Sequence, residues 1–141
     1  MAPLRQRTLP DESDVLAPDG SRIRLLVSGP RGSMVHCELP AGGTSLAVTH
    51  RTVEEVWYVL AGRGELWRRT DDEERVDVLI SGLSCDIPLG THFQFRNTGT
   101  EYLQILIVTM PPWPGYEEAA RVPDHWPVSA DEGLGPGSES R

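Results

Sequence analysis

The sequence predicts an all-β protein built as a single barrel or sandwich of antiparallel strands. Three observations predict this fold class: many short apolar runs, turn-forming residues between them, and no helical period before residue 115. Short strands at regular spacing without intervening helices indicate a sandwich or barrel. At 141 residues the chain is long enough for one domain with a buried core.

Nine short runs rich in Val, Ile, Leu and aromatic residues are the expected strands. In chain order they cover residues 22–28, 33–39, 45–50, 55–61, 64–69, 76–81, 84–89, 93–97 and 102–108. Turn-forming clusters such as "APDG", "PAGG", "LAGRG" and "NTGT" flank or separate them. The charged run "RRTDDEER" at 68–75 is expected to form a solvent-exposed hairpin tip.

The two ends of the chain differ in composition from the expected barrel, which covers 15–112. Residues 1–14 mix Pro, Arg and acids without a period, which predicts a flexible N-terminal arm. Residues 113–128 are expected to form a short helical turn and to pack on the barrel through Trp113 and Trp126. Residues 129–141 are rich in Gly, Ser and acids, a composition typical of a disordered tail.

The charge and cysteine content limit the partners and the compartment that we expect. A formal net charge of −8 argues against nucleic acid and against docking to an anionic membrane. No apolar run approaches the roughly 20 residues of a membrane helix, and no signal-peptide core is visible at the start. Cys37 and Cys85 lie in apolar runs and are expected to be free thiols, which favours a cytoplasmic location.

The stretch "LAVTHRTVEE" contains a histidine and a pair of acids, and it lies between two glycines, Gly42 and Gly62. Gly42 is followed by five residues and then Val48, and His50 lies two positions after Val48. Glu55 follows after four more residues, and six further residues lead to Gly62. This spacing singles out Glu55 rather than its neighbour in the acidic pair.

A second set of residues repeats this kind of regular spacing. Gly82 is followed by five residues and Pro88, one residue and Gly90, two residues and Phe93, then three residues and Asn97. With both sets, the stretch from 42 to 97 resembles the cupin superfamily, whose two motifs have these spacings. The resemblance implies a cupin-type β-barrel, also called a double-stranded β-helix or jelly roll.

The departures from the family pattern fall on its metal ligands. In metal-binding cupins the first motif supplies two histidines and a glutamate, and the second supplies a histidine. Here Val48 and Phe93 replace the first and last of these ligands, while His50 and Glu55 are kept. His92 lies one residue before the lost position, and strand alternation points it away from the interior unless a bulge reorients it.

Two ligands are fewer than catalytic zinc or facial-triad iron needs, because each normally takes three protein ligands. We therefore expect no obligatory cofactor. If a divalent metal binds, the ligands expected are His50, Glu55 and a displaced His92. A metal-dependent dioxygenase or isomerase with this irregular ligand set stays open as an alternative.

The leading expectation is a metal-free enzyme acting on a small organic molecule. Some cupins with incomplete metal sites are isomerases, dehydratases or cyclases, and the resemblance implies His50 as the base and Glu55 as its orienting partner or acid. Trp57, Phe93 and Phe95 would form an aromatic wall for a flat or sugar-like ligand. The other interpretation of these aromatics is that they fill the barrel.

Two further expectations concern the pocket mouth and the oligomeric state. Gln104 interrupts an apolar strand, so it either projects into the pocket or faces solvent. Cupins of this size are commonly dimers, and the resemblance therefore implies a homodimer through edge strands. A third function stays open beside the two enzymes: a non-catalytic cupin that binds a small metabolite, or nothing, in its barrel.

Overall fold

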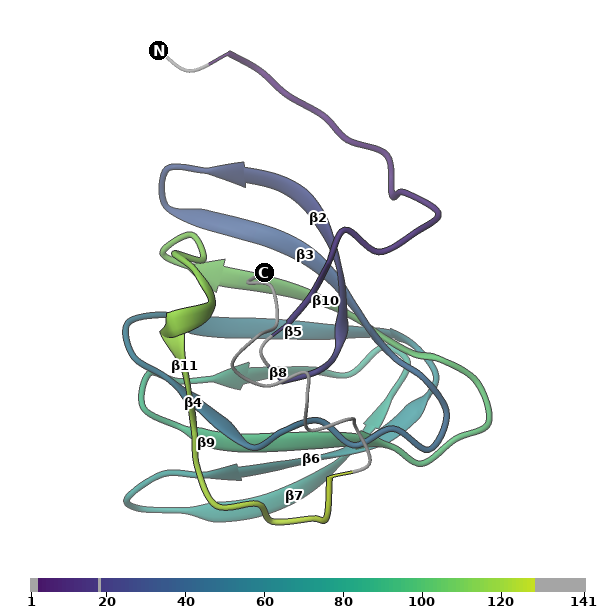
Figure 1. Cartoon of the computed structure of the whole chain (residues 1–141), viewed down its shortest axis with the longest axis vertical. Helices are drawn as coiled ribbons and strands as arrows, with labels where there is room; N and C mark the ends of the chain where they lie inside the picture. Colours follow the sequence, from purple (N-terminus) through teal and green to yellow (C-terminus); the bar gives the residue numbers. More distant parts are fainter. Residues whose placement is uncertain (1–2, 18, 129–141) are drawn as a thin grey trace.

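A computed structural model describes residues 3–17 and 19–128. These residues form an all-β jelly roll of two antiparallel sheets, which confirms the predicted fold class (Figure 1). The strand order is β1-β2-β3-β10-β5-β8 in the six-stranded sheet and β11-β4-β9-β6-β7 in the five-stranded sheet. The tail expected to be disordered, 129–141, lies outside the described residues.

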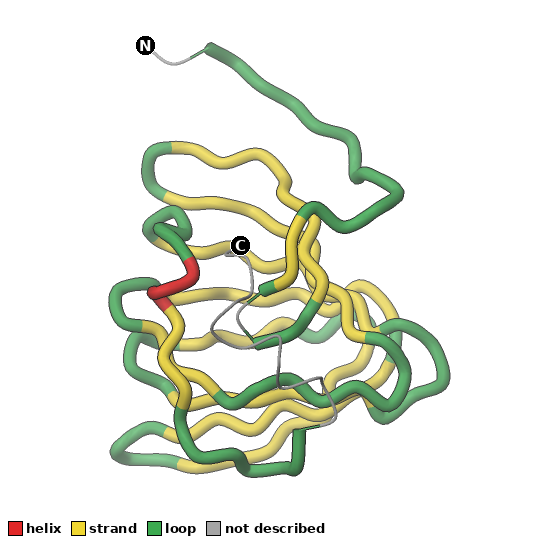
Figure 2. The backbone as a smooth tube through the Cα atoms, viewed as in Figure 1, coloured by secondary structure: helices red, strands yellow, loops and turns green. Residues whose placement is uncertain are grey.

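The strands match the nine expected runs, with two short strands added near the ends. The six-stranded sheet contains β1 (Val15–Leu16), β2 (Arg22–Gly29), β3 (Gly32–Leu39), β10 (Leu103–Met110), β5 (Glu54–Ala61) and β8 (Ser84–Ile87). The five-stranded sheet contains β11 (Ala119–Arg121), β4 (Val48–His50), β9 (His92–Asn97), β6 (Arg63–Arg69) and β7 (Glu74–Ile80). Within the described residues the helical element is one 3-10 turn, η1 (Tyr116–Glu118) (Figure 2).

The core lies between the two sheets. Exposed and buried residues alternate along β5, so that Glu55, Trp57 and Val59 point inward. The same alternation along β10 buries every second residue from Leu103 onward. The largest fully buried side chains are Trp57, Phe93, Phe95, Ile23, Leu46, Leu66, Leu79, Ile87, Leu103, Ile105, Ile107 and Gln94.

The motif glycines occupy turns that other residues would adopt only with strain. Gly42, Gly62, Gly82 and Gly90 all have positive φ, between +78° and +93°. At Gly62 a Cβ atom would also lie 2.5 Å from the carbonyl oxygen of Tyr102. Glycine adopts a positive φ without strain, and it alone has no Cβ to clash. The spacing of the family motif therefore corresponds to the tight turns between barrel strands.

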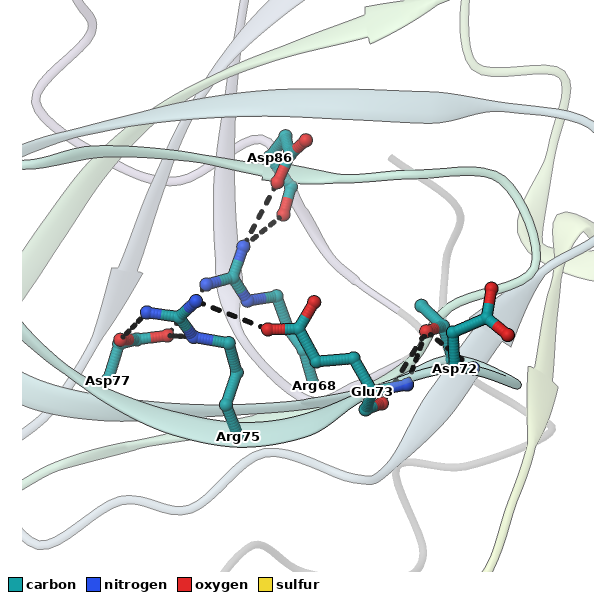
Figure 3. Close-up of polar contacts among 7 residues, drawn as sticks. Arg68, Asp72, Glu73, Arg75, Asp77 and Asp86 are labelled. Atoms are coloured by element: carbon teal, nitrogen blue, oxygen red, sulfur yellow. Dashed lines mark hydrogen bonds and ion pairs between the residues drawn. The ribbon is translucent and has the colours of Figure 1, made fainter.

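The charged run at 68–75 forms the end of the β6–β7 hairpin, as predicted, and also ties the two sheets together. Arg68 on β6 donates to Asp77 on β7 at 2.7 Å and to the side chain of Asp86 on β8 at 3.0 Å (Figure 3). Arg75 donates to Asp77 as well, at 2.8 Å. Since β7 and β8 are edge strands of different sheets, Arg68 links the sheets at this side of the barrel.

The N-terminal arm lies along the outer edge of β2 (Figure 1). Arg7 donates to the carbonyl oxygen of Leu25 at 2.8 Å and to Asp14 at 3.0 Å. Arg24 on β2 donates to the carbonyl oxygen of Pro10 at 2.8 Å. Arginine side chains therefore hold the arm where a further strand would otherwise pair with β2.

Both cysteines are free thiols, as expected. Cys37 is buried, and burial raises the pKa of the half-buried Cys85 thiol to about 11. No helix in the described part of the chain is long and apolar enough to cross a membrane.

Candidate functional site

The two motif residues that the chain keeps lie side by side inside the barrel. His50 ends β4 and Glu55 is the second residue of β5. Nδ1 of His50 lies 3.8 Å from Oε2 of Glu55, and their side chains are 1% and 0% exposed. The structure therefore brings together an imidazole and a carboxylate that water does not reach.

The other carboxylate oxygen of Glu55 is held by a tryptophan on the same face of β5. Nε1 of Trp57 donates to Oε1 of Glu55 at 2.9 Å. This contact follows from strand geometry, because residues two apart point to the same side. The carboxylate thus has one oxygen toward His50 and the other fixed by Trp57.

The three aromatic residues expected to form a wall do pack against one another. The Trp57 ring meets Phe93 edge-on at 5.8 Å and Phe95 at 5.2 Å between ring centroids. Phe93 also meets the His50 ring edge-on at 5.1 Å. Trp57, Phe93 and Phe95 are each at most 2% exposed; Trp57 contacts Glu55, Phe93 contacts His50, and Phe95 packs on Trp57.

The positions of the two lost metal ligands face each other across neighbouring strands. Val48 on β4 pairs directly with Phe93 on β9, and both are buried. Two apolar side chains therefore stand where a complete cupin site has imidazoles. Among the described residues no group of three His, Cys, Asp or Glu side chains is arranged to hold a metal ion. The donor set here does not fit the three-ligand sites of zinc or iron.

His92 lies away from the pair, as strand alternation predicts. It pairs with Thr49 across the β4–β9 ladder, one position along from the Val48–Phe93 pair. Its Nδ1 lies 3.5 Å from a guanidinium nitrogen of Arg69. The structure does not bring His92 together with His50 and Glu55.

Gln104 also lies outside the barrel interior. It alternates with the buried Leu103 and Ile105 along β10, so its side chain is on the outer face of the six-stranded sheet. There its Oε1 lies 2.9 Å from Nε2 of His36. Of the two orientations that the sequence left open, the structure has Gln104 facing outward.

A segment after β10, residues 111–118, crosses the end of the barrel beside His50, and we call it the strap. Trp113 in the strap meets the His50 ring edge-on at 4.9 Å between centroids. Its backbone N–H donates to Oγ of Ser33 at 3.2 Å. Trp113 is half-buried whereas His50 is buried, so Trp113 covers the imidazole.

The far end of the strap is fixed by a buried carboxylate that sequence reasoning missed. Glu118 accepts hydrogen bonds from the hydroxyl of Thr52 at 2.6 Å and the backbone N–H of Val53 at 3.0 Å. Burial raises the pKa of Glu118, but the hydrogen bonds from Thr52, Val53 and Arg51 outweigh it and lower that pKa below its ordinary value. The turn after His50 is thus bound to the strap.

Gln94, a second residue that the sequence did not single out, holds the segment after β11. Its side chain is fully buried, and its amide donates to the carbonyl oxygens of Ser45 at 2.8 Å and Trp126 at 3.0 Å. Its Oε1 accepts from the backbone N–H groups of His125 and Trp126. The only sequence signal was a polar residue between two phenylalanines.

The chain is similar to proteins of one known family. The family model described as "Cupin domain" matches residues 35–109, which is more than half of the chain. The chain is a cupin. An uncharacterized protein of Methanocaldococcus jannaschii is 35% identical to this cupin over 100 residues, covering 67% of this chain and 77% of that protein.

Solved structures agree on the fold. A predicted oxalate decarboxylase from Thermotoga maritima superposes with a TM-score of 0.60 at 18% identity, covering 74% of this cupin and 99% of that chain. KdgF from Halomonas sp. superposes with a TM-score of 0.57 at 16% identity, covering 74% of this cupin and 88% of that chain. At these identities the likeness shows a shared fold and says nothing about activity. The activity has to be inferred from the side chains of the site.

Proposed function

We propose that this cupin binds a small organic molecule in its barrel and transfers a proton with His50 and Glu55, without an obligatory metal. The observation that carries the proposal is the buried imidazole–carboxylate pair, with Nδ1 of His50 3.8 Å from Glu55. An imidazole suits proton transfer near neutral pH because its unperturbed pKa is about 6.5. His50 is the base, and Glu55 stabilises the imidazolium that forms.

The burial of His50 and Glu55 supports their assignment as the proton-transferring pair. In a water-excluded site the attraction between imidazolium and carboxylate is much stronger than in bulk water. Trp57 holds one oxygen of Glu55, so the carboxylate is oriented before any ligand arrives. The nitrogen of His50 away from Glu55, Nε2, is the atom that takes the proton.

The reaction class that fits is removal of a proton from a carbon next to a carbonyl group. Isomerisation, dehydration and cyclisation of small metabolites can all begin with this step, and it needs a base rather than a redox centre. The aromatic wall of Trp57, Phe93 and Phe95 suits a flat or sugar-like molecule. The ligand enters past Trp113, which has to move because it covers His50.

A non-catalytic cupin is the second candidate, and one observation favours it. His50, Glu55, Trp57, Phe93 and Phe95 are each at most 3% exposed and pack against one another. Side chains that fill a barrel in this way also stabilise a fold without any ligand. A non-catalytic cupin with a filled barrel would keep the strap closed, whereas the proposed enzyme has to open it to admit a molecule, and a non-catalytic cupin that binds a metabolite would open it without proton transfer.

Native mass spectrometry of freshly purified protein, combined with metal analysis, tests the proposal. We expect a small organic ligand to co-purify or to bind from a metabolite extract, and metal to be far below one ion per chain. Stoichiometric metal that EDTA removes, and that is lost in His50→Ala, would contradict the metal-free mechanism. Failure of every extract component to bind would favour a non-catalytic cupin whose barrel is filled by its own side chains.

A further inference from the structure

A row of polar side chains crosses the six-stranded sheet at the strap end of the barrel. Ser33 on β3 pairs with Thr109 on β10, and Thr109 pairs with Glu55 on β5. Thr109 and Glu55 are 0% and 1% exposed, so both point into the barrel. Residues directly opposite each other in a ladder have Cβ atoms roughly 5 Å apart. The hydroxyl-bearing side chain of Thr109 therefore lies next to the carboxylate that contacts His50.

The hydroxyl groups on the inner face of this sheet are found at that end of the barrel. In the next inward-facing row Val35 on β3 pairs with Ile107 on β10, which pairs with Trp57 on β5. These three side chains are each at most 2% exposed. Along β3 and β10 the interior therefore changes from polar to apolar within one row, and the polar row is the one that contains Glu55.

The hydroxyl pair of Ser33 and Thr109 has one hydrogen left to donate. Each hydroxyl carries one hydrogen and can also accept. The two hydroxyls are hydrogen-bonded to each other, which uses one of the two hydrogens. Oγ of Ser33 also accepts from the backbone N–H of Trp113, which uses neither. Within residues 3–17 and 19–128 neither hydroxyl has a further hydrogen-bond partner, so one hydrogen of the pair has no acceptor.

Trp113 brings this spare donor and His50 to the same place. Its backbone N–H donates to Ser33 at 3.2 Å, and its ring meets the His50 ring edge-on at 4.9 Å between centroids. The hydroxyl pair and the imidazole therefore lie on either side of one strap residue. A molecule that takes the place of the Trp113 ring above His50 comes within reach of both.

We propose that the hydroxyl pair of Ser33 and Thr109 donates a hydrogen bond to the carbonyl oxygen of the ligand while His50 removes the neighbouring proton. This inference rests on the proposed function, because it names the group that stabilises the charge formed in that reaction. When Nε2 of His50 takes the proton, the electrons of the C–H bond form a C=C bond. The π electrons of the carbonyl group move onto its oxygen, which becomes an enolate oxygen and accepts the hydrogen bond.

The surroundings make such a donor necessary. The aromatic wall offers the new charge apolar surface, and an unpaired charge is costly there. A fixed donor aimed at an oxygen that becomes negative is worth about 100-fold in rate. The ligand class follows from the same requirement: a small ketone or aldehyde with a hydrogen on the carbon next to its carbonyl group. An acetal, which cannot form an enolate, does not meet it.

Calorimetric titration of the full chain near neutral pH tests the proposal, with the enolate of cyclohexane-1,3-dione as the probe. This probe already carries an enolate oxygen, so its binding needs no proton transfer. The double variant Ser33→Ala, Thr109→Val should bind it at least about tenfold more weakly than the wild type, because a hydrogen bond to a charged oxygen is lost. Thr109→Ser keeps the hydroxyl and should keep the wild-type affinity.

Two features of the design separate this effect from a change in packing. Ser33→Ala also removes the acceptor of the Trp113 N–H, but losing that contact would ease opening of the strap and tighten binding, which is the opposite change. Circular dichroism establishes that the variants are folded. A double variant with Thr109→Ala takes the place of the first if that one does not fold.

Wild-type affinity for the enolate in the double variant would overturn the assignment of the hydroxyl pair. So would a wild type that does not bind the enolate up to about 10 mM, or a loss of affinity in Thr109→Ser as large as in the double variant. The proposed function fails separately. If a bound ketone exchanges no proton while the double variant still loses affinity for the enolate, the hydroxyl pair holds the oxygen and His50 is not the base.

Discussion

Glu55 touches both His50 and Trp57, with one carboxylate oxygen 3.8 Å from the imidazole and the other 2.9 Å from the indole nitrogen. The indole contact means that the carboxylate is held in place even when His50 is neutral. A buried carboxylate with two partners is costly to disturb, because removing it leaves polar groups without water. Stability measurements can therefore detect this arrangement before any substrate is known.

Glu55→Ala should lower the free energy of unfolding by about 2–4 kcal/mol, because it removes both contacts and leaves a buried cavity. Its exposed neighbour on the same strand provides a control, since Glu54→Ala should change stability by less than about 0.5 kcal/mol. Urea unfolding followed by circular dichroism measures both. Equal effects of the two substitutions would mean that Glu55 is not held as described.

The lowered pKa of Glu118 predicts that the folded protein loses stability in acid. Its pKa is lowered in the folded protein from an ordinary value of 4.5, so its contribution is complete above that pH. The contribution is lost as the pH falls below 4.5 toward the folded-state pKa. Thermal unfolding between about pH 3 and 7 should show this loss in the wild type and a flatter profile in Glu118→Gln. The exposed neighbour substitution Glu117→Gln should keep the wild-type profile.

Trp113→Ala should open the end of the barrel above His50. The indole N–H of Trp57, buried against Glu55, should then exchange with deuterium faster than in the wild type, because solvent reaches it through local opening. NMR of the indole protons measures this rate. Trp126→Ala removes a tryptophan that packs on Arg96 instead, and it should leave the Trp57 exchange rate unchanged. Equal acceleration in both variants would argue against the strap as the cover.

Gln94→Ala should release the segment that follows β11. The substitution leaves the buried carbonyl of Ser45 and the partly buried carbonyl of Trp126 without their partner, which should cost about 2–3 kcal/mol. Trypsin should then cut after Arg121 faster than in the wild type, whereas Gln6→Ala on the N-terminal arm should not change the rate. Unchanged cleavage in Gln94→Ala would show that other contacts hold the segment.

Much of the fold could be predicted from the sequence because the spacing of the glycines indicates where the turns between strands lie. Gly62 has to be glycine because its φ is positive and because a Cβ atom would clash with the carbonyl oxygen of Tyr102. Positions of this kind can be recognised in a single sequence. The His50–Glu55 pair was predictable for a related reason, since the motif fixes the number of residues in the turn that joins β4 to β5. Strand alternation likewise indicated that His92 points outward.

Other parts of the site depend on contacts that no local pattern encodes. Trp113 and Glu118 reach the barrel only because of the path that the chain takes after β10, and they bind residues more than 60 positions earlier. Gln104 was ambiguous for a different reason. Its strand is apolar on both faces, so alternation could not tell the inner face from the outer one.

In the reaction that we propose, His50 and Glu55 remove a proton from a molecule bound in the barrel. Deuterium incorporation in D₂O, measured by NMR on a carbonyl compound that native mass spectrometry has found to bind, tests it most directly. We expect the wild type to incorporate deuterium at least about 100-fold faster than His50→Ala and Glu55→Gln. Equal rates in the wild type and both variants, or no incorporation into any bound compound, would contradict it.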